Sequence, residues 1–427
     1  MRGWQKFKSI ARKIMTRRVF GLAMGAAVGL TANVMTTAPA EAHGEKSQMA
    51  FLRMRTVQWY DLKWSKTDVN VNDVVEISGK FNVFSNWPQA VMNPDVSFLN
   101  VGEPGPVFVR EAAYINGQPV PRSFSLTPGE RYDFKILLRA RRAGDWHVHT
   151  LMNVEGGGPI IGPGEWLKIK GSMADFINPE TTLDGRKVDI ETMGIGTIYG
   201  WHFLWFVAGV AWIGYWFSRG GFVGRYFGVV AGKGDTMISP KDEKIAFASL
   251  AATLVVVLVG YSMGESGSPR TLPLQAGLLN IPASDPALYP KDVSIKYERA
   301  TYKVPGRELD VTLQITNNGT SPLRIGEFAT AGVRFLNPDV MKEPVNYPDY
   351  LLAPQGLSLS DAQPIQPGTT KTLVIKAQDA AWDVERLSDL YYDTDSSIGG
   401  LLFLFDEQGN RHVLEIGGPA VPDFQTT

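Results

Sequence analysis

The sequence predicts a mainly β protein in which two β-barrel or β-sandwich domains, residues 43–190 and 270–427, are joined by two transmembrane helices. Three observations support this fold class. The first 42 residues have the layout of a signal peptide, two long apolar runs occupy the middle of the chain, and the flanking regions consist of short β-rich stretches between turn residues. A chain of 427 residues, 44% of them hydrophobic, is long enough for two such domains.

The first element, residues 1–42, is predicted to be a secretory signal peptide. A basic stretch at residues 2–18 precedes an apolar run at residues 19–30, and Ala40-Glu41-Ala42 matches the small-residue pattern that signal peptidase cleaves. Cleavage there makes His43 the first residue of the mature protein. An uncleaved N-terminal anchor is the alternative, and the two alanines argue against it.

The two apolar runs in the middle of the chain predict transmembrane helices. Residues 195–217 contain no formally charged side chain, and residues 245–263 are equally apolar. Both reach the roughly 20 residues that a helix needs to cross a hydrocarbon core about 30 Å thick, and a buried core helix is the alternative. The loop between them, residues 218–244, carries five lysine and arginine residues. Such loops stay in the cytoplasm, so both β domains are expected in the periplasm.

Four tryptophans of the first run form a stripe. At 100° per residue they fall within about 60° of one helix face. Anchoring at the lipid interface and contact with a partner helix both fit this stripe. Its members are Trp201, Trp205, Trp212 and Trp216.

The flanking regions contain period-two runs typical of half-buried strands, such as YDFKILLRA in the first and TKTLVIKAQ in the second. A weak repeat also links them. Phe-Leu-Asn at Phe98 is followed 30 residues later by Pro-Gly at Pro128, and Phe-Leu-Asn at Phe335 is followed 32 residues later by Pro-Gly at Pro367. This repeat predicts duplication of one β-sandwich.

Charge and cysteine content limit the possible functions. The net charge is -1, so no overall positive field indicates binding to nucleic acid. The chain has no cysteine, which excludes disulfides, haem attached through cysteine and thiolate-ligated blue copper. Any metal must be bound by nitrogen or oxygen, and the chain has only five histidines for this purpose.

The histidines His147 and His149 lie in the strand-like stretch GDWHVHT. Alternate side chains of a strand share a face, so both imidazoles should project from one side, about 6.6 Å apart along the chain, and can converge on one ion. Trp146, Val148 and Thr150 are expected to pack on the opposite face. Taken alone, the pair fits two structural histidines equally well.

His43 strengthens the metal interpretation. A mature N-terminal histidine offers a chelate made of its ring nitrogen and its α-amine, whose unperturbed pKa is about 7.7 to 8.0. A cation can therefore displace the amine proton near neutral pH. With His147 and His149 the set has four nitrogen donors, which favours Cu(II), with zinc as the rival.

Five stretches together resemble the B subunit of the copper membrane monooxygenases, the family of particulate methane monooxygenase and ammonia monooxygenase. The resemblance covers essentially the whole mature chain, and its copper-binding histidines fall on His43, His147 and His149. The stretches are HGEKSQ from His43, FLRMRTVQWYD from Phe51, DWHVHT from Asp145, NVEGGGPIIGPG from Asn153 and VPGRELDV from Val304.

The resemblance implies two periplasmic cupredoxin-like domains on a bacterial inner, or intracytoplasmic, membrane. It further implies a complex with two other membrane subunits, A and C, assembled as a trimer of heterotrimers in lipid. That complex oxidises methane to methanol with O₂ and a quinol-type reductant. Methane is favoured over ammonia because MNVEGGGPIIGPG looks more like the methane enzymes.

Two alternatives remain at this point: the B subunit of an ammonia monooxygenase, and a membrane-tethered copper-binding or delivery protein without turnover. No residue is assigned a catalytic role, and the oxidation site lies either in this chain or in a partner subunit. The chain alone is expected to be inactive, because it has no flavin or nicotinamide motif and only two predicted spans.

Several polar residues near these motifs have less certain roles. Gln58 stands where some relatives have a histidine ligand, and nearby Asn82 is a weak ligand, so a second copper site is doubtful. His412 is expected to be an exposed histidine and His202 to cap or pack at the membrane interface, with a metal-ligand role as the alternative for each. Glu45 and Asp145 are either solvated or orient a ring N–H of the site.

Overall fold

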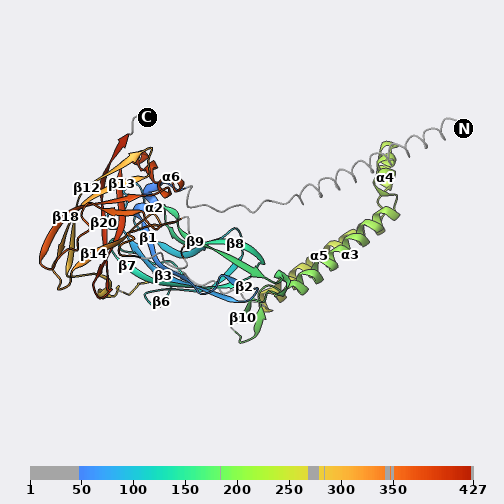
Figure 1. Cartoon of the computed structure of the whole chain (residues 1–427). Helices are drawn as coiled ribbons and strands as arrows, with labels where there is room; N and C mark the ends of the chain where they lie inside the picture. Colours follow the sequence, from blue (N-terminus) through green and yellow to red (C-terminus); the bar gives the residue numbers. More distant parts are fainter. Residues whose placement is uncertain are drawn as a thin grey trace.

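The computed structural model describes residues 48–182, 184–267, 278–282, 284–341, 347 and 351–424 (Figure 1). The predicted signal peptide, His43 and Glu45 lie outside these residues. Strand residues clearly outnumber helix residues in the described structure, which confirms the mainly β prediction. The two β domains pack beside each other, and a helical hairpin extends away from them (Figure 1).

The first β domain has two antiparallel-rich sheets that face each other across a hydrophobic core. Its five-stranded sheet contains, in spatial order, β1 (Val57–Trp64), β3 (Val74–Val83), β7 (Arg131–Ala140), β5 (Phe108–Ile115) and β6 (Gln118–Pro119). Its four-stranded sheet contains β2 (Asp68–Asn70), β9 (Gly158–Lys170), β8 (Gly144–Val154) and β4 (Ser97–Gly102).

The core of this domain follows from the alternation of its strands. Buried and half-buried side chains alternate along β7, as expected for a strand with one face on the core. Ile77 and Ile136 from the five-stranded sheet and Val148, Met152 and Leu167 from the four-stranded sheet are all fully buried. The two layers therefore hold β8, which carries the histidine pair, in a rigid frame.

The second β domain is built on nine strands. They are, in spatial order, β16 (Leu352–Ala353), β15 (Val333–Leu336), β14 (Leu323–Thr330), β19 (Ser397–Asp406), β20 (Arg411–Phe424), β12 (Val293–Val304), β13 (Glu308–Asn317), β18 (Thr369–Gln378) and β17 (Leu357–Leu359). β20 joins the two halves, because it pairs antiparallel with β19 up to Pro419 and parallel with β12 from Ala420 onward. The short helices α6 (Ala381–Val384) and η6 (Leu387–Tyr392) precede β19.

The two Pro-Gly turns of the predicted repeat have equivalent places. Gly129 and Gly368 have φ angles of +88° and +71°, a conformation that favours glycine. Each turn leads into a ten-residue strand, β7 or β18, that pairs with another ten-residue strand, β3 or β13. Duplication stays a prediction, and these placements are consistent with it.

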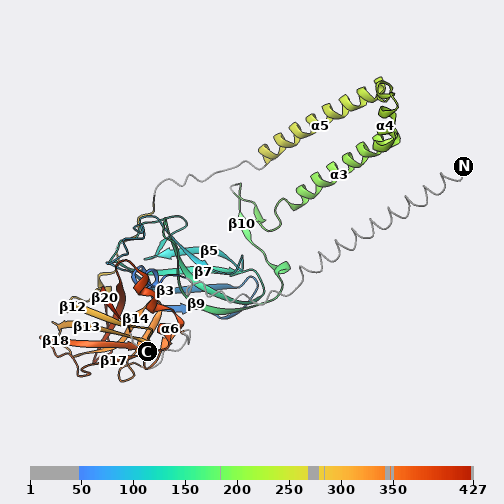
Figure 2. The same ribbon diagram turned by 90° about the horizontal axis from the view of Figure 1, so that it is seen from above.

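The predicted spans are both helical, and they run side by side as α3 (Ile195–Ser218) and α5 (Pro240–Gly267), joined through α4 (Gly221–Val230) and η3 (Gly234–Thr236) (Figure 2). Among the described helices, α5 is the one that is long and apolar enough to cross a membrane, and none of its apolar window is buried in the protein. The tryptophans, tyrosines, glycines and histidine of α3 lower its mean hydropathy. A double crossing of the membrane therefore stays a prediction.

The connections at the domain boundaries were not predicted. A small hairpin of β10 (Pro179–Thr181) and β11 (Lys187–Asp189), preceded by η2 (Met173–Asp175), links the first domain to α3. After α5, Leu279 and η4 (Pro286–Leu288) lie near the first domain, because the Leu279 N–H donates to Ser123 and the Leu288 carbonyl accepts from Arg131. The start of the predicted second domain is therefore in contact with the first.

Candidate metal centre

β8 places the histidine pair as its sequence pattern predicts. Val148 and Thr150 are fully buried on the core side of the strand, and His147 and His149 lie on the other face. The two imidazole rings are nearly perpendicular, with an interplanar angle of 78° and 4.3 Å between their centroids. Two ring nitrogens at this separation can reach a common ion.

A backbone carbonyl fixes the orientation of His149. Its Nδ1 lies 3.0 Å from the oxygen of Gly162 on the neighbouring strand β9. Because a carbonyl only accepts hydrogen bonds, Nδ1 carries the proton and Nε2 keeps its lone pair. A carbonyl partner on one ring nitrogen is the usual way in which proteins present the other nitrogen to a metal.

β9 makes room for this ring with glycine. Gly164 is the register partner of His149, and a Cβ at Gly164 would lie 2.7 Å from His149 Nδ1. A β-bulge between His149 and Leu151 shifts the register just beyond this point. Only glycine therefore leaves the imidazole its place against the strand.

An aromatic ring covers His147. Trp166, its register partner on β9, stacks on the imidazole with 5.0 Å between centroids and 26° between planes. Trp166 is 46% exposed, whereas His147 and His149 are 2% and 3% exposed. Trp166 also lines a cavity of about 1120 Å³ to which the second domain contributes Arg334. The tryptophan thus separates the pair from this polar space.

Two neighbouring residues refine the prediction. Trp146 is only half-buried, because its ring folds back over Gly144 and its Nε1 donates to the Arg142 carbonyl at 3.0 Å. Asp145 is exposed, and the carbonyl of Gly162 takes the orienting role that the sequence suggested for this carboxylate. The contact between His149 and β9 had one signal in the sequence, the glycines of GPIIGPG. Glycine inside a strand often marks a place where another group approaches the backbone closely.

A half-buried carboxyl group is one residue away from the register partner of His149. Glu103 follows Gly102, which is the register partner of His149 on β4. Its carboxylate accepts the Phe108 N–H at 3.0 Å and so closes the loop between β4 and β5. Burial raises the pKa of Glu103 to about 7, against the effect of its backbone hydrogen bonds.

The third predicted ligand, His43, lies outside the described residues. Within the part of the chain that is described, no group of three or more His, Cys, Asp or Glu side chains could hold a metal. The described part of the centre therefore consists of two buried imidazoles, one with a fixed tautomer. These donors fit copper and also zinc.

The two residues at the position of the second copper site, Gln58 and Asn82, form other contacts. Gln58 and Asn82 are register partners on β1 and β3, and both are fully buried. The Gln58 amide donates to the Trp59 carbonyl at 2.9 Å, and the Asn82 oxygen accepts from the Arg131 guanidinium at 3.2 Å. A guanidinium at this position repels a metal cation.

The remaining histidines are apart from the pair in the fold. His412 lies on β20 of the second domain and is half-buried, not exposed as predicted, because it packs near Asp292, whose carboxylate oxygen is 3.6 Å from its Nδ1. His202 lies on α3, where its Nδ1 hydrogen-bonds the Ile198 carbonyl at 2.8 Å within the same helix. Neither joins His147 and His149.

Comparison with known proteins identifies the family. The family model of the monooxygenase B-subunit protein matches residues 44–424, a range that includes both β domains and the helical hairpin. This chain belongs to the monooxygenase B-subunit family. It is also 54% identical over 409 residues to a protein of Methylococcus capsulatus named particulate methane monooxygenase alpha subunit. The match covers 94% of this chain and 98% of that relative.

Among solved structures, this monooxygenase chain is similar to the cupredoxin domain of amoB from Nitrosocaldus yellowstonii. The identity is 18% and the TM-score 0.24, and the match covers 28% of this chain and 91% of that domain. Family membership makes this chain a subunit of an oxidoreductase complex. The letter B in the family's name and the word alpha in the relative's name are different subunit labels.

Proposed function

We propose that this chain is the copper-binding B subunit of a particulate methane monooxygenase, a complex that oxidises methane to methanol with O₂ and a quinol-type reductant. The observation that carries the proposal is the buried pair His147 and His149, in which Gly162 sets the tautomer of His149, in a chain 54% identical to a particulate methane monooxygenase subunit. The same relative favours methane over ammonia as the substrate.

The described residues would bind copper through ring nitrogens, with His43 completing the set. His149 offers Nε2, because its Nδ1 proton is held by the Gly162 carbonyl. Trp166 covers His147 and limits access of water from the cavity beside it. Copper would supply one-electron redox chemistry at this position. Whether oxidation occurs here or in a partner subunit is a separate question.

The helical hairpin supports a membrane complex. Trp205 and Trp212 of α3 are each 38% exposed, and Phe203 is 69% exposed. Apolar aromatic surface of this kind requires lipid or other helices around it. We propose that the chain lies in a bacterial inner membrane with subunits A and C, as a trimer of heterotrimers, with both β domains in the periplasm, as the family resemblance implies.

The test is the copper content of the purified complex. Alanine at both His147 and His149 should remove the copper of this chain and its electron paramagnetic resonance (EPR) signal, whereas His412→Ala should leave both unchanged. Unchanged copper in the double variant would refute the proposal. Methane oxidation by the emptied complex then distinguishes an oxidation site in this chain, where activity is lost, from one in a partner subunit, where activity persists.

A second experiment separates the subunit from a self-sufficient enzyme. The isolated chain loaded with copper should oxidise neither methane nor propene with duroquinol, whereas the whole complex in lipid should. Rates comparable to those of the complex would place the complete reaction in this chain. Intact mass should also show a mature start at His43, and one added N-terminal alanine should weaken copper binding.

A further inference from the structure

The chain just after His43 is attached to the strand that supports the histidine pair. Gln48 is the first described residue, and its side-chain amide pairs with the β9 backbone: Nε2 donates to the Pro159 carbonyl, and Oε1 accepts the Ile161 N–H at 3.0 Å. Ile161 is the register partner of Leu151, two residues beyond His149 on β8. Gln48 thus holds the chain at the hairpin that presents the imidazoles.

The next residues form a short helix, α2 (Ala50–Arg55), that packs on the second β domain. Gly399 of β19 lies so close that a Cβ added to it would be 2.7 Å from the backbone oxygen of Met54. Met54 itself is completely buried. Backbone meets backbone here, so the position of α2 is set by β19.

Two buried arginines of α2 reinforce this contact. Arg53 forms an ion pair of 3.1 Å with Glu385, and both side chains are at most 2% exposed. Its guanidinium also donates to the Glu385 backbone carbonyl. Such a buried charged pair resists separation, because removing one partner leaves the other charge in a low-dielectric site.

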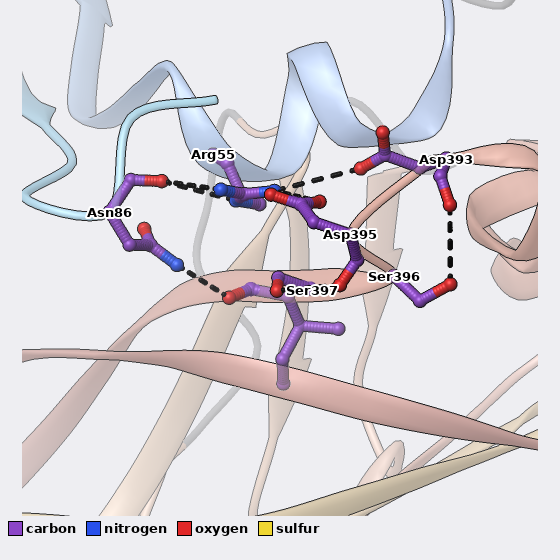
Figure 3. Close-up of polar contacts among 7 residues, drawn as sticks. Arg55, Asn86, Asp393, Asp395, Ser396 and Ser397 are labelled. Atoms are coloured by element: carbon purple, nitrogen blue, oxygen red, sulfur yellow. Dashed lines mark hydrogen bonds and ion pairs between the residues drawn. The ribbon is translucent and has the colours of Figure 1, made fainter. Parts of the chain in front are cut away.

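Arg55 connects the two domains directly (Figure 3). Its guanidinium donates twice to the Asn86 carbonyl of the first domain, at 3.1 and 2.8 Å, and to the Asp395 carboxylate of the second domain at 2.5 Å. Asp393 lies 3.6 Å from the same guanidinium, and the Asn86 amide donates to Ile398 of β19 at 3.0 Å. The last residue of α2 is therefore fixed from both sides.

We propose that the second β domain is a positioning element of the metal centre in the first domain, acting through α2 and Gln48 on the N-terminal ligand. This inference rests on the proposed function, in which His43 completes the copper site. His43 lies five positions before Gln48, so a fixed Gln48 limits the N-terminal donors to a radius of about 17 Å at 3.3 to 3.6 Å per residue. Holding a ligand near its site reduces the entropy lost on binding.

The experiment uses the full chain in its purified complex and a Cu(II) chelator as competitor. Gln48→Ala removes the β9 attachment, and Arg55→Gln removes the charge that α2 presents to the second domain. Arg411→Gln is the matched control, since it breaks another interdomain pair, with Asp61, at a position outside α2. His147→Ala is the reference for loss of the site.

We expect Gln48→Ala and Arg55→Gln to release copper at roughly tenfold lower chelator concentration, the lower end of the effect of supporting residues on metal sites. Their EPR spectra should change, because the nitrogen donor set is altered, and Arg411→Gln should match the wild type. Wild-type affinity and spectrum in Gln48→Ala would overturn the proposal. An equal loss in Arg411→Gln would also overturn it, because general loosening of the domains would then be the cause.

The two proposals fail in different ways. Full copper retention in His147→Ala would refute both the proposed function and this inference. If His147→Ala loses copper while Gln48→Ala keeps the wild-type copper affinity and EPR spectrum, only the positioning role is refuted. If Gln48→Ala binds copper more weakly while a folded Arg55→Gln variant binds it as the wild type does, the second domain does not contribute to positioning.

Discussion

The two β domains each contain a long antiparallel hairpin, β8–β9 in the first and β19–β20 in the second, and the two hairpins use their faces differently. In β19 every residue from Ser397 to Leu404 is buried, so both faces are covered by protein. In β8 the core face is covered in the same way, and the other face carries His147 and His149 beneath Trp166. The second hairpin is a packing surface, and the first presents the two histidines that we propose as metal ligands.

In each hairpin, a glycine without a side chain leaves space for a group that packs against the strand. Gly399 on β19 admits the backbone of α2, and Gly164 on β9 admits the ring of His149. A backbone neighbour cannot move aside, whereas an imidazole can rotate. Close approach at glycine therefore supports packing in the second domain, and in the first it fixes the position of a proposed metal ligand.

The largest expected effect comes from the buried pair between α2 and the second domain. Glu385→Ala should lower the free energy of unfolding by about 3 to 5 kcal/mol, because it removes the carboxylate that neutralises buried Arg53. Asp61→Ala breaks a partly exposed interdomain pair with Arg411 and should cost about 0.2 to 1 kcal/mol. Thermal unfolding of the detergent-solubilised chain measures both, and equal costs would contradict the special role of α2.

Next in size is the packing of α2 on β19. Gly399→Ala should cost about 1 to 3 kcal/mol of folding free energy, because the new methyl group meets the Met54 carbonyl oxygen and the backbone must shift. The same unfolding measurement applies. A stability equal to that of the wild type would mean that α2 is free to move away from β19, and the positioning proposal would then lose its structural basis.

The same substitution in the first hairpin should act on the metal instead. Gly164→Ala should displace the His149 ring and weaken its hydrogen bond to Gly162, at a cost in stability of about 1 kcal/mol. Copper affinity should fall roughly tenfold, since the carbonyl that orients a ligand is disturbed. Copper competition and EPR record this effect. An unchanged spectrum would show that the Gly162 carbonyl does not set the ligand geometry.

Local sequence patterns predicted the elements well. The span predicted at residues 195–217 corresponds to α3, Ile195–Ser218, and the one at residues 245–263 lies within α5, Pro240–Gly267. α5 begins earlier because its first turns are polar, with Asp242 and Glu243, and polarity ends an apolar run without ending a helix. Period-two alternation and the H-x-H spacing likewise predicted which face of β8 packs on the core and which carries both histidines.

Contacts between distant residues had no such signal. Arg53 and Glu385 are 332 positions apart, and nothing near either residue indicates the other. The partners of the histidine pair, Gly162 and Trp166, depend on the register of β8 with β9, which a bulge shifts. Register follows from packing of the whole sheet, so a reading of single strands could not supply it.

The smallest expected effect is a pH dependence at the end of α2. Burial, followed by the neighbouring Asp395, raises the pKa of Asp393 to about 6, although Arg55 opposes the shift. Asp395 is exposed, and although partial desolvation opposes the shift, its hydrogen bond with Arg55 lowers its pKa below the ordinary value, so it stays ionised near pH 6. Between pH 4 and 6 the folded chain therefore binds more protons at Asp393 than the unfolded chain does, with 3.8 as the ordinary pKa. Stability from this group rises as pH falls through 6, and above pH 6 its charge is a cost.

Asp393→Asn, which resembles the protonated form, should therefore be more stable than the wild type at pH 7.5 and equal to it near pH 4. Thermal unfolding of both proteins across this range gives the difference directly. Ser396→Ala is a suitable control, because Ser396 donates to the Asp393 backbone carbonyl and carries no titrating group. A variant that is less stable than the wild type at pH 7.5 would show that attraction to Arg55 outweighs burial. Asp393 and Asp395 would then both stabilise α2, and the second domain would bind α2 more tightly at neutral pH than in acid.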